Sequence, residues 1–156
     1  MDAIPQNYLR RNVEQVRDRI NRAAASARRD VKQIKLISVS KTFSASDVEF
    51  ACQTGLENFG ENRVQEAVDK MDHKFSRPIQ WHLIGHLQSN KAKTAVEHFD
   101  WIHSVDSLKL LRRLERTATE SGAAPRILIQ ADLAGEATKH GARIDEIRQI
   151  CPVSYT

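Results

Sequence analysis

Hydrophobic positions along this chain change their spacing several times, and each change marks a new predicted element. Near the start, apolar residues recur every three or four positions, which is the spacing of one helical face. These residues are Leu9, Val13, Val16, Ile20, Ala23 and Ala27. Five short apolar segments follow, and their lengths and flanking turn residues predict buried strands. The segments span residues 35–41, 57–60, 79–85, 101–104 and 126–132.

Each predicted strand is followed by residues with helical apolar spacing. The predicted helices span residues 48–52, 64–71, 92–99, 108–118 and 144–150. A capping-box pattern at residues 46–49 precedes the first of them, and Gly55 ends it. About five strand–helix units with short connections predict an α/β chain with a parallel sheet. Because crossovers between parallel strands are right-handed, two arrangements stay open: a doubly wound sheet or a section of a barrel.

Composition places the chain among ordinary soluble domains. It has 156 residues, of which 40% are hydrophobic and 28% are charged, and no linker interrupts them, so we expect a single domain over residues 1–156. No apolar stretch approaches the roughly 18 residues that span a membrane, and the N-terminus lacks the order of a secretory signal. The two distant cysteines, Cys52 and Cys151, predict a reducing cytoplasm rather than a disulfide framework.

The net charge of +4 arises from 24 basic and 20 acidic residues that are largely interleaved. A basic surplus can attract phosphate or nucleic acid. A mixed, solvated surface accounts for the interleaving equally well, so we expect neither a nucleic-acid partner nor a membrane partner.

All five predicted strands have polar residues at or just after their carboxyl ends. They are Ser40 and Lys41, then 60–62, then Gly85 and His86, then Ser104, and then Asp132. Carboxyl ends of parallel strands meet at one edge of a sheet, where α/β barrels keep their chemistry. The pattern therefore favours a shared functional rim, although loops are polar in any case.

Lys41 is the residue of this rim with the most specific chemistry. An amine at the partly dry mouth of a barrel loses proton affinity, because removal of water disfavours the ammonium form. A neutral amine can attack an aldehyde and form an imine. The competing interpretation is a solvated lysine that simply caps the strand.

Other familiar chemistry is absent from the sequence. It contains no dinucleotide-binding fingerprint, no Walker loop and no serine in a nucleophile elbow. His82 and His86 are four residues apart, but a rise of about 3.3 Å per residue along a strand separates them by roughly 13 Å. We therefore expect no metal site from this pair.

Imine chemistry at Lys41 suggests pyridoxal phosphate, which needs a lysine for its aldehyde and further contacts for its ring and phosphate. His82 shares a strand face with Gln80 and Ile84, and that face approaches the cofactor if it lines the barrel. The alternative for His82 is a hydrogen-bonded place in a polar core. Asn62 follows the second strand, where it either donates to the cofactor ring or caps the next helix.

Five runs of sequence resemble the pyridoxal phosphate homeostasis protein family. They are LISVSKT at 36–42, FGENRVQE at 59–66, WHLIGHLQSNK at 81–91, IHSVDS at 102–107 and the segment 130–141. The runs are long, follow the order of the family and cover the chain to about Ile150. The resemblance implies a parallel (β/α) barrel of the alanine racemase N-terminal type, preceded by a helix.

The same resemblance implies the function and the site. Family members hold pyridoxal 5'-phosphate, a form of vitamin B6, as an imine on the lysine that matches Lys41. Asn62 and His82 match positions that approach the cofactor. Members have no established catalytic turnover and are thought to buffer or deliver the cofactor in the cytoplasm, with cofactor-requiring apo-enzymes as candidate partners.

The sequence departs from the family pattern after Ile150. Family chains continue through three more strands, so this chain supplies about five of eight strand–helix units and an incomplete barrel. The family's phosphate-binding amides come from the part without a counterpart here, in keeping with barrels that bind phosphate after strands seven and eight. Two alternatives therefore stay open: a racemase-like imine-dependent enzyme, and a truncated fragment without function.

Overall fold

The computed structural model describes residues 6–135 and 140–151. Five parallel strands form one sheet in the order of the sequence. They are β1 (Ser38–Val39), β2 (Asn58–Glu61), β3 (Gln80–Leu83), β4 (Trp101–Val105) and β5 (Arg126–Ile129). A doubly wound sheet reverses its strand order at a switch point, whereas a barrel adds each strand beside the last. The observed order is therefore that of a barrel section, one of the two arrangements that the sequence leaves open.

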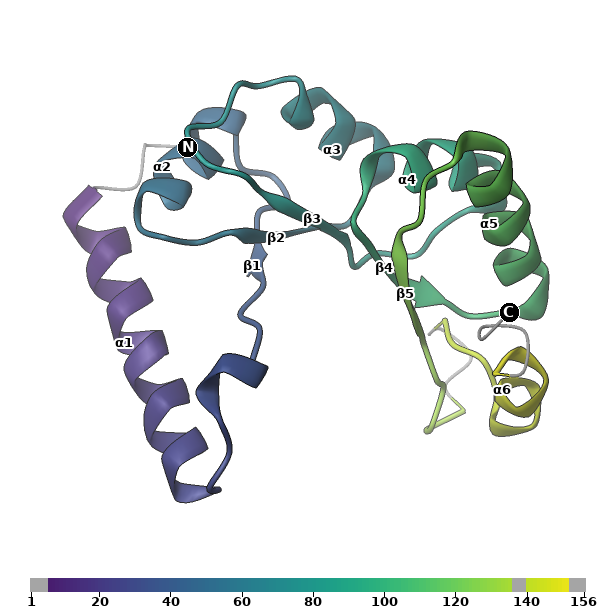
Figure 1. The fold of residues 1–156 in the computed structure, drawn as a ribbon, viewed down its shortest axis with the longest axis horizontal. Coiled ribbons are helices and arrows are strands. Elements are labelled where there is room, and N and C mark those ends of the chain that lie inside the picture. Colours follow the sequence, from purple (N-terminus) through teal and green to yellow (C-terminus); the bar gives the residue numbers. More distant parts are fainter. Residues whose placement is uncertain (1–5, 136–139, 152–156) are drawn as a thin grey trace.

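Helices cover one face of the sheet and leave the other open. The helical elements are α1 (Gln6–Ser26), η1 (Val31–Gln33), α2 (Ala45–Gln53), α3 (Val64–Met71), η2 (Ser89–Lys91), α4 (Ala92–His98), α5 (Leu108–Ser121) and α6 (Ile144–Ile150). Figure 1 shows α2 to α5 along one face, with α1 and α6 beyond the two ends of the sheet. We call the face without covering helices the open face. No helix of residues 6–135 and 140–151 is long and apolar enough to cross a membrane.

The hydrophobic core lies between the sheet and helices α2 to α5. Side chains alternate between the two faces of a strand, so every second residue enters this core. Phe59, Leu83 and Ile102 are at most 1% exposed and contribute from three neighbouring strands. Gly60 lies on the opposite face, where side chains pack closely against it. A Cβ at this position would lie 3.0 Å from the Ile84 side chain and 3.2 Å from the Ile37 side chain.

The first strand is shorter than the sequence predicts. A strand over 35–41 is expected, but only Ser38–Val39 pairs with β2, and Val39 is 49% exposed. In the described chain β1 is an edge strand with one neighbour, so less of it is held by ladder hydrogen bonds. The other four predicted strands agree with the structure to within three residues at each end.

The start of α2 also differs from the prediction. Ser44 caps the helix by accepting a hydrogen bond from the Asp47 N–H, and the Asp47 carboxylate accepts one from the Ser44 N–H. The predicted box at Ser46 is not formed, because Ser46 lies inside α2, and the Glu49 carboxylate accepts a hydrogen bond from the Ser76 backbone N–H. The capping box therefore lies two residues earlier than the sequence pattern indicates.

A buried polar network joins the ends of β1 and β2 to α3. Glu61 is 0% exposed, and its Oε1 accepts hydrogen bonds from the Ser40 hydroxyl at 2.6 Å and from the Lys70 amine at 2.7 Å. The same amine donates to the backbone carbonyl of Ser40 at 2.8 Å. We call these three residues the Ser40–Glu61–Lys70 network. It fixes the backbone one residue before Lys41.

Replacement of Lys70 by methionine tests this network. Lys70→Met leaves the Glu61 carboxylate buried without its counter-ion, which typically lowers stability by about 3–5 kcal/mol. The exposed pair Arg116–Glu120 supplies the control, because Arg116→Met removes a 2.9 Å ion pair at the surface, worth under about 1 kcal/mol. Urea denaturation measures both variants. Equal losses of stability would show that the buried network has no special role.

Candidate functional site

Lys41 lies in a tight turn, two residues after the end of β1. The turn is closed by a hydrogen bond from the Phe43 N–H to the Ser40 carbonyl at 3.1 Å, and Thr42 has a positive φ of 69°. The Ser40 N–H also donates to the carbonyl of Gly60 on β2. The backbone on both sides of Lys41 is therefore well fixed, and its side chain leaves from the carboxyl end of the strand.

The amine of Lys41 has no hydrogen-bond or ion-pair partner among the residues that the structure describes, and the residue is exposed. The water-poor surroundings that the sequence analysis expects are thus not provided by the described chain, because nothing in it covers this end of the edge strand. The position at the strand end agrees with the prediction. An unpaired amine in this place is chemically available to an aldehyde.

Asn62 lies at the neighbouring strand end and is half-buried. The N-cap position of α3 is occupied by Arg63, so Asn62 does not fill the capping role that was its alternative. Its backbone packs directly against Gly85, where a Cβ would overlap the Asn62 carbonyl oxygen and Cα. Glycine at position 85 therefore allows the ends of β2 and β3 to approach closely. The Asn62 amide has no partner within the described chain.

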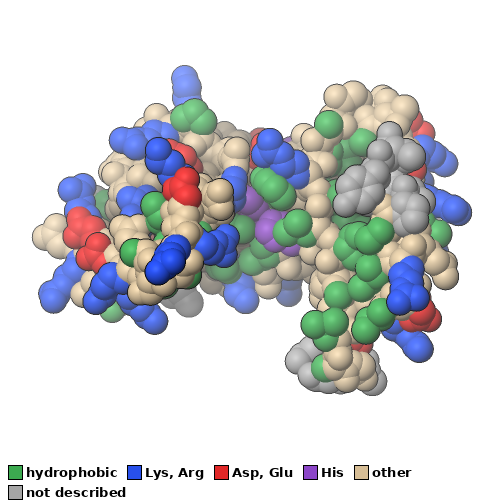
Figure 2. Space-filling model, turned by 60° about the horizontal axis from the view of Figure 1, so that its bottom comes forward, with side chains coloured by type: hydrophobic (Ala, Val, Ile, Leu, Met, Phe, Trp, Pro, Cys, Tyr) green, Lys and Arg blue, Asp and Glu red, His purple; other side chains and the backbone are tan. Residues whose placement is uncertain are grey.

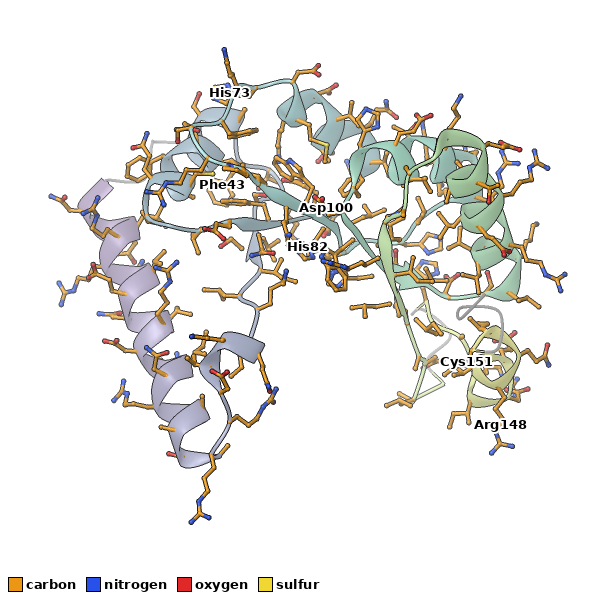
Figure 3. The ribbon with its side chains drawn as sticks, in the orientation of Figure 1. Phe43, His73, His82, Asp100, Arg148 and Cys151 are labelled. Atoms are coloured by element: carbon orange, nitrogen blue, oxygen red, sulfur yellow. The ribbon has the colours of Figure 1, made fainter. Side chains whose placement is uncertain are left out.

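His82 occupies the middle of the open face and is 1% exposed. Its Nε2 lies 3.0 Å from the Asn58 Oδ1, and its Nδ1 lies 2.9 Å from the His103 Nε2. An amide oxygen only accepts, so His82 donates from Nε2 and accepts at Nδ1 from His103. The Trp101 ring stacks on His82 at 5.7 Å between centroids. Figure 3 labels His82 on this side of the sheet.

The surroundings of His82 keep its ring neutral. Burial lowers its pKa from 6.5 to about 4, and the nearby His103 and Lys35 act in the same direction. Burial also lowers the pKa of His103. Both ring nitrogens of His82 are already bonded, as in the polar-core interpretation of the sequence. Neither is free to bind a second ligand without loss of an existing hydrogen bond.

Trp101 extends this polar layer toward the amino ends of the strands. The Lys35 amine lies 5.4 Å from the centroid of its ring and donates to the Gln80 side chain at 2.7 Å. The Arg126 guanidinium lies 5.2 Å from the same ring. Figure 2 shows histidine side chains at the middle of the molecule, with basic and hydrophobic side chains around them. Sequence reasoning missed these partners, although their alternation along neighbouring strands is the signal that places them on one face.

A proton titration of the His82 ring tests its burial. Between pH 6.5 and about 4 the unfolded chain binds a proton at His82 that the folded chain does not. The free energy of unfolding therefore falls as the pH falls through this window. Nuclear magnetic resonance should report a midpoint near pH 4 for the His82 ring protons. A midpoint near 6.5 would mean that water reaches the ring.

Comparison with known sequences identifies a family. Residues 4–153 match the model described as alanine racemase, N-terminal domain. The chain is 39% identical over 147 residues to a pyridoxal phosphate homeostasis protein of Escherichia coli K12, which covers 92% of this chain and 63% of that protein. A homeostasis protein of Pseudomonas aeruginosa PAO1 is 40% identical over 136 residues, or 87% and 59% of the two chains. The chain thus spans about three-fifths of these relatives.

Solved structures agree with these sequence matches. PipY of Synechococcus elongatus PCC7942 without PLP has a TM-score of 0.75 and 43% identity, over 86% of this chain and 63% of that one. Its PLP-bound form has a TM-score of 0.69 and 41% identity over the same shares. A histidine racemase from Leuconostoc mesenteroides, at 13% identity and a TM-score of 0.69 over 94% and 37% of the chains, shares the fold alone. The chain therefore belongs to the alanine racemase N-terminal domain family, and within it resembles the pyridoxal phosphate homeostasis proteins.

Proposed function

We propose that this chain binds pyridoxal 5'-phosphate through Lys41 and serves in homeostasis of that cofactor. The observation that carries the proposal is the unpaired Lys41 amine at the carboxyl end of β1. The names of the relatives support it, since several are pyridoxal phosphate homeostasis proteins and one related structure contains PLP. No other lysine in the described chain lies within two residues after the end of a strand of the sheet.

The described residues fit the aldehyde end of the cofactor. Lys41 would hold the cofactor through its amine, and the bound cofactor would supply the electrophilic aldehyde carbon for that bond, with the carbonyl oxygen released as water. The Ser40–Glu61–Lys70 network holds the backbone from which the side chain extends.

Asn62 and His82 are proposed to contact the ring of the cofactor. The Asn62 amide is free within the described chain and can donate to a ring oxygen. His82 lies in the middle of the open face. Because both of its ring nitrogens are already hydrogen-bonded, we propose that it packs against the cofactor ring rather than donating a proton to it. The described residues thus account for the aldehyde and ring contacts of the proposed site.

We further propose binding without turnover, in the cytoplasm, with cofactor-requiring apo-enzymes as recipients. The names of the relatives, which are homeostasis proteins, support binding without turnover. Because the chain shares its fold with a histidine racemase, catalysis should nevertheless be tested directly. An assay for alanine racemisation should give no rate above that of free pyridoxal phosphate. A rate above that background which Lys41→Arg removes would favour the enzyme alternative.

Reductive labelling tests the Lys41 assignment. The chain is incubated with pyridoxal phosphate, reduced with borohydride, digested and analysed by mass spectrometry. The label should lie mainly on the peptide that contains Lys41, and Lys41→Arg should remove it, because arginine keeps the charge but forms no stable imine.

Lys35 supplies the matched control at the other end of the same strand segment. Its amine is already hydrogen-bonded to Gln80, so Lys35→Arg should leave the labelling of Lys41 unchanged. A label spread evenly over many lysines, or one that persists in Lys41→Arg, would contradict the assignment.

A further inference from the structure

A second cluster of reactive side chains lies after the carboxyl ends of β3 and β4. His86, Asp106 and His140 each offer a ligand atom, and these atoms all lie within 4.8 Å of one another. His86 Nδ1 is 3.4 Å from the Asp106 Oδ2, and the rings of His86 and His140 stack with centroids 3.8 Å apart. We call these residues the His86–Asp106–His140 cluster. None of them belongs to the proposed cofactor contacts.

The backbone holds His140 in place. The Gln130 side-chain amide donates to the His140 carbonyl at 2.6 Å, and the Ala142 N–H donates to the Gln130 carbonyl at 2.7 Å. Gly141 packs so tightly that a Cβ there would lie 2.7 Å from the Asp132 nitrogen. These contacts tie the segment beside His140 to the chain that continues from β5. The imidazole is thus presented from an anchored backbone.

The other two ligands are equally well placed. His86 follows Gly85, whose close contact with Asn62 fixes the end of β3. Asp106 follows β4 directly, and its side chain is 16% exposed against 37% for His86. The cluster is therefore firmly supported by its backbone and still open to an ion from solvent.

The ligand types select a class of metal. Two imidazoles and one carboxylate suit zinc, cobalt, nickel or iron, whereas calcium and magnesium prefer oxygen ligands alone. Ligand atoms about 2.0–2.1 Å from a tetrahedral metal lie roughly 3.3 Å apart. Atoms within 4.8 Å of one another reach that spacing when the side chains rotate, and the two stacked imidazoles must turn so that both ring planes contain the metal. Three protein ligands leave a coordination position for water or an anion.

An ordinary ion pair does not account for the whole cluster. It would explain the approach of His86 to Asp106 but not the position of His140, whose ring stacks on His86 and has no hydrogen bond or ion pair among the described residues. We propose that His86, Asp106 and His140 bind a divalent transition-metal ion of the zinc class. The sequence predicts no metal, because the four-residue spacing of His82 and His86 along a strand does not suit one, whereas Asp106 and His140 come from other segments.

Metal titration of the cofactor-free chain tests the proposal. Zn²⁺ is followed by calorimetry and Co²⁺ by its visible absorption, which reports the ligand geometry. We expect one saturable site per chain. His86→Ala and His140→Ala should each weaken Zn²⁺ binding by at least about tenfold, as should the isosteric Asp106→Asn.

His98 provides the matched control. It is exposed on α4, and its Nδ1 is hydrogen-bonded to the Thr94 carbonyl at 2.9 Å. His98→Ala should keep the full affinity, and Lys41→Arg should also keep it, which separates this proposal from that of cofactor binding. Circular dichroism confirms that each variant is folded. Absence of a saturable site in the parent chain, or equal weakening by His98→Ala, would overturn the proposal.

Discussion

The buried carboxylate of Glu61 is the constraint on which the site depends. A charge that is 0% exposed is costly unless hydrogen bonds and a counter-ion compensate for the water it has lost. Ser40 and Lys70 provide both at Oε1, whereas the buried Oε2 has no hydrogen-bond partner among the described residues. Lys70 also reaches back from α3 to the Ser40 carbonyl. A short strand at the edge of the sheet thereby gains a fixed carboxyl end. The position from which the Lys41 side chain starts follows from this arrangement.

The sequence predicts the elements of the fold well, because spacing of apolar residues reports which face of a helix or strand is buried. Spacing alone does not tell a doubly wound sheet from a barrel section, since both bury parallel strands under helices. The sequential order β1 to β5 distinguishes them, and it is a long-range property. The short β1 and the cap at Ser44 were missed for a related reason, because both depend on contacts between distant segments. In the described chain, Val39 has a paired strand on one side only, and Glu49 accepts a hydrogen bond from Ser76.

The candidate site shows the same division between local and long-range information. The placement of Lys41 and Asn62 is predictable, because both lie within two residues after the end of a strand and carboxyl ends of parallel strands meet at one edge. The partners of His82 are not, since Asn58 and His103 come from two other strands. The His86–Asp106–His140 cluster is harder still. Its three members lie in separate segments, and the spacing of residues within any one segment does not predict that they lie close together.

The central claim is that the amine after β1 receives the cofactor while Asn62 and His82 border its ring. A crystal structure of this chain grown with pyridoxal phosphate tests that claim most directly. The account predicts continuous electron density from the Lys41 Nζ to the cofactor, with the ring beside Asn62 on the open face. Cofactor density joined to another lysine, or bound on the helix-covered side of the sheet, would contradict it.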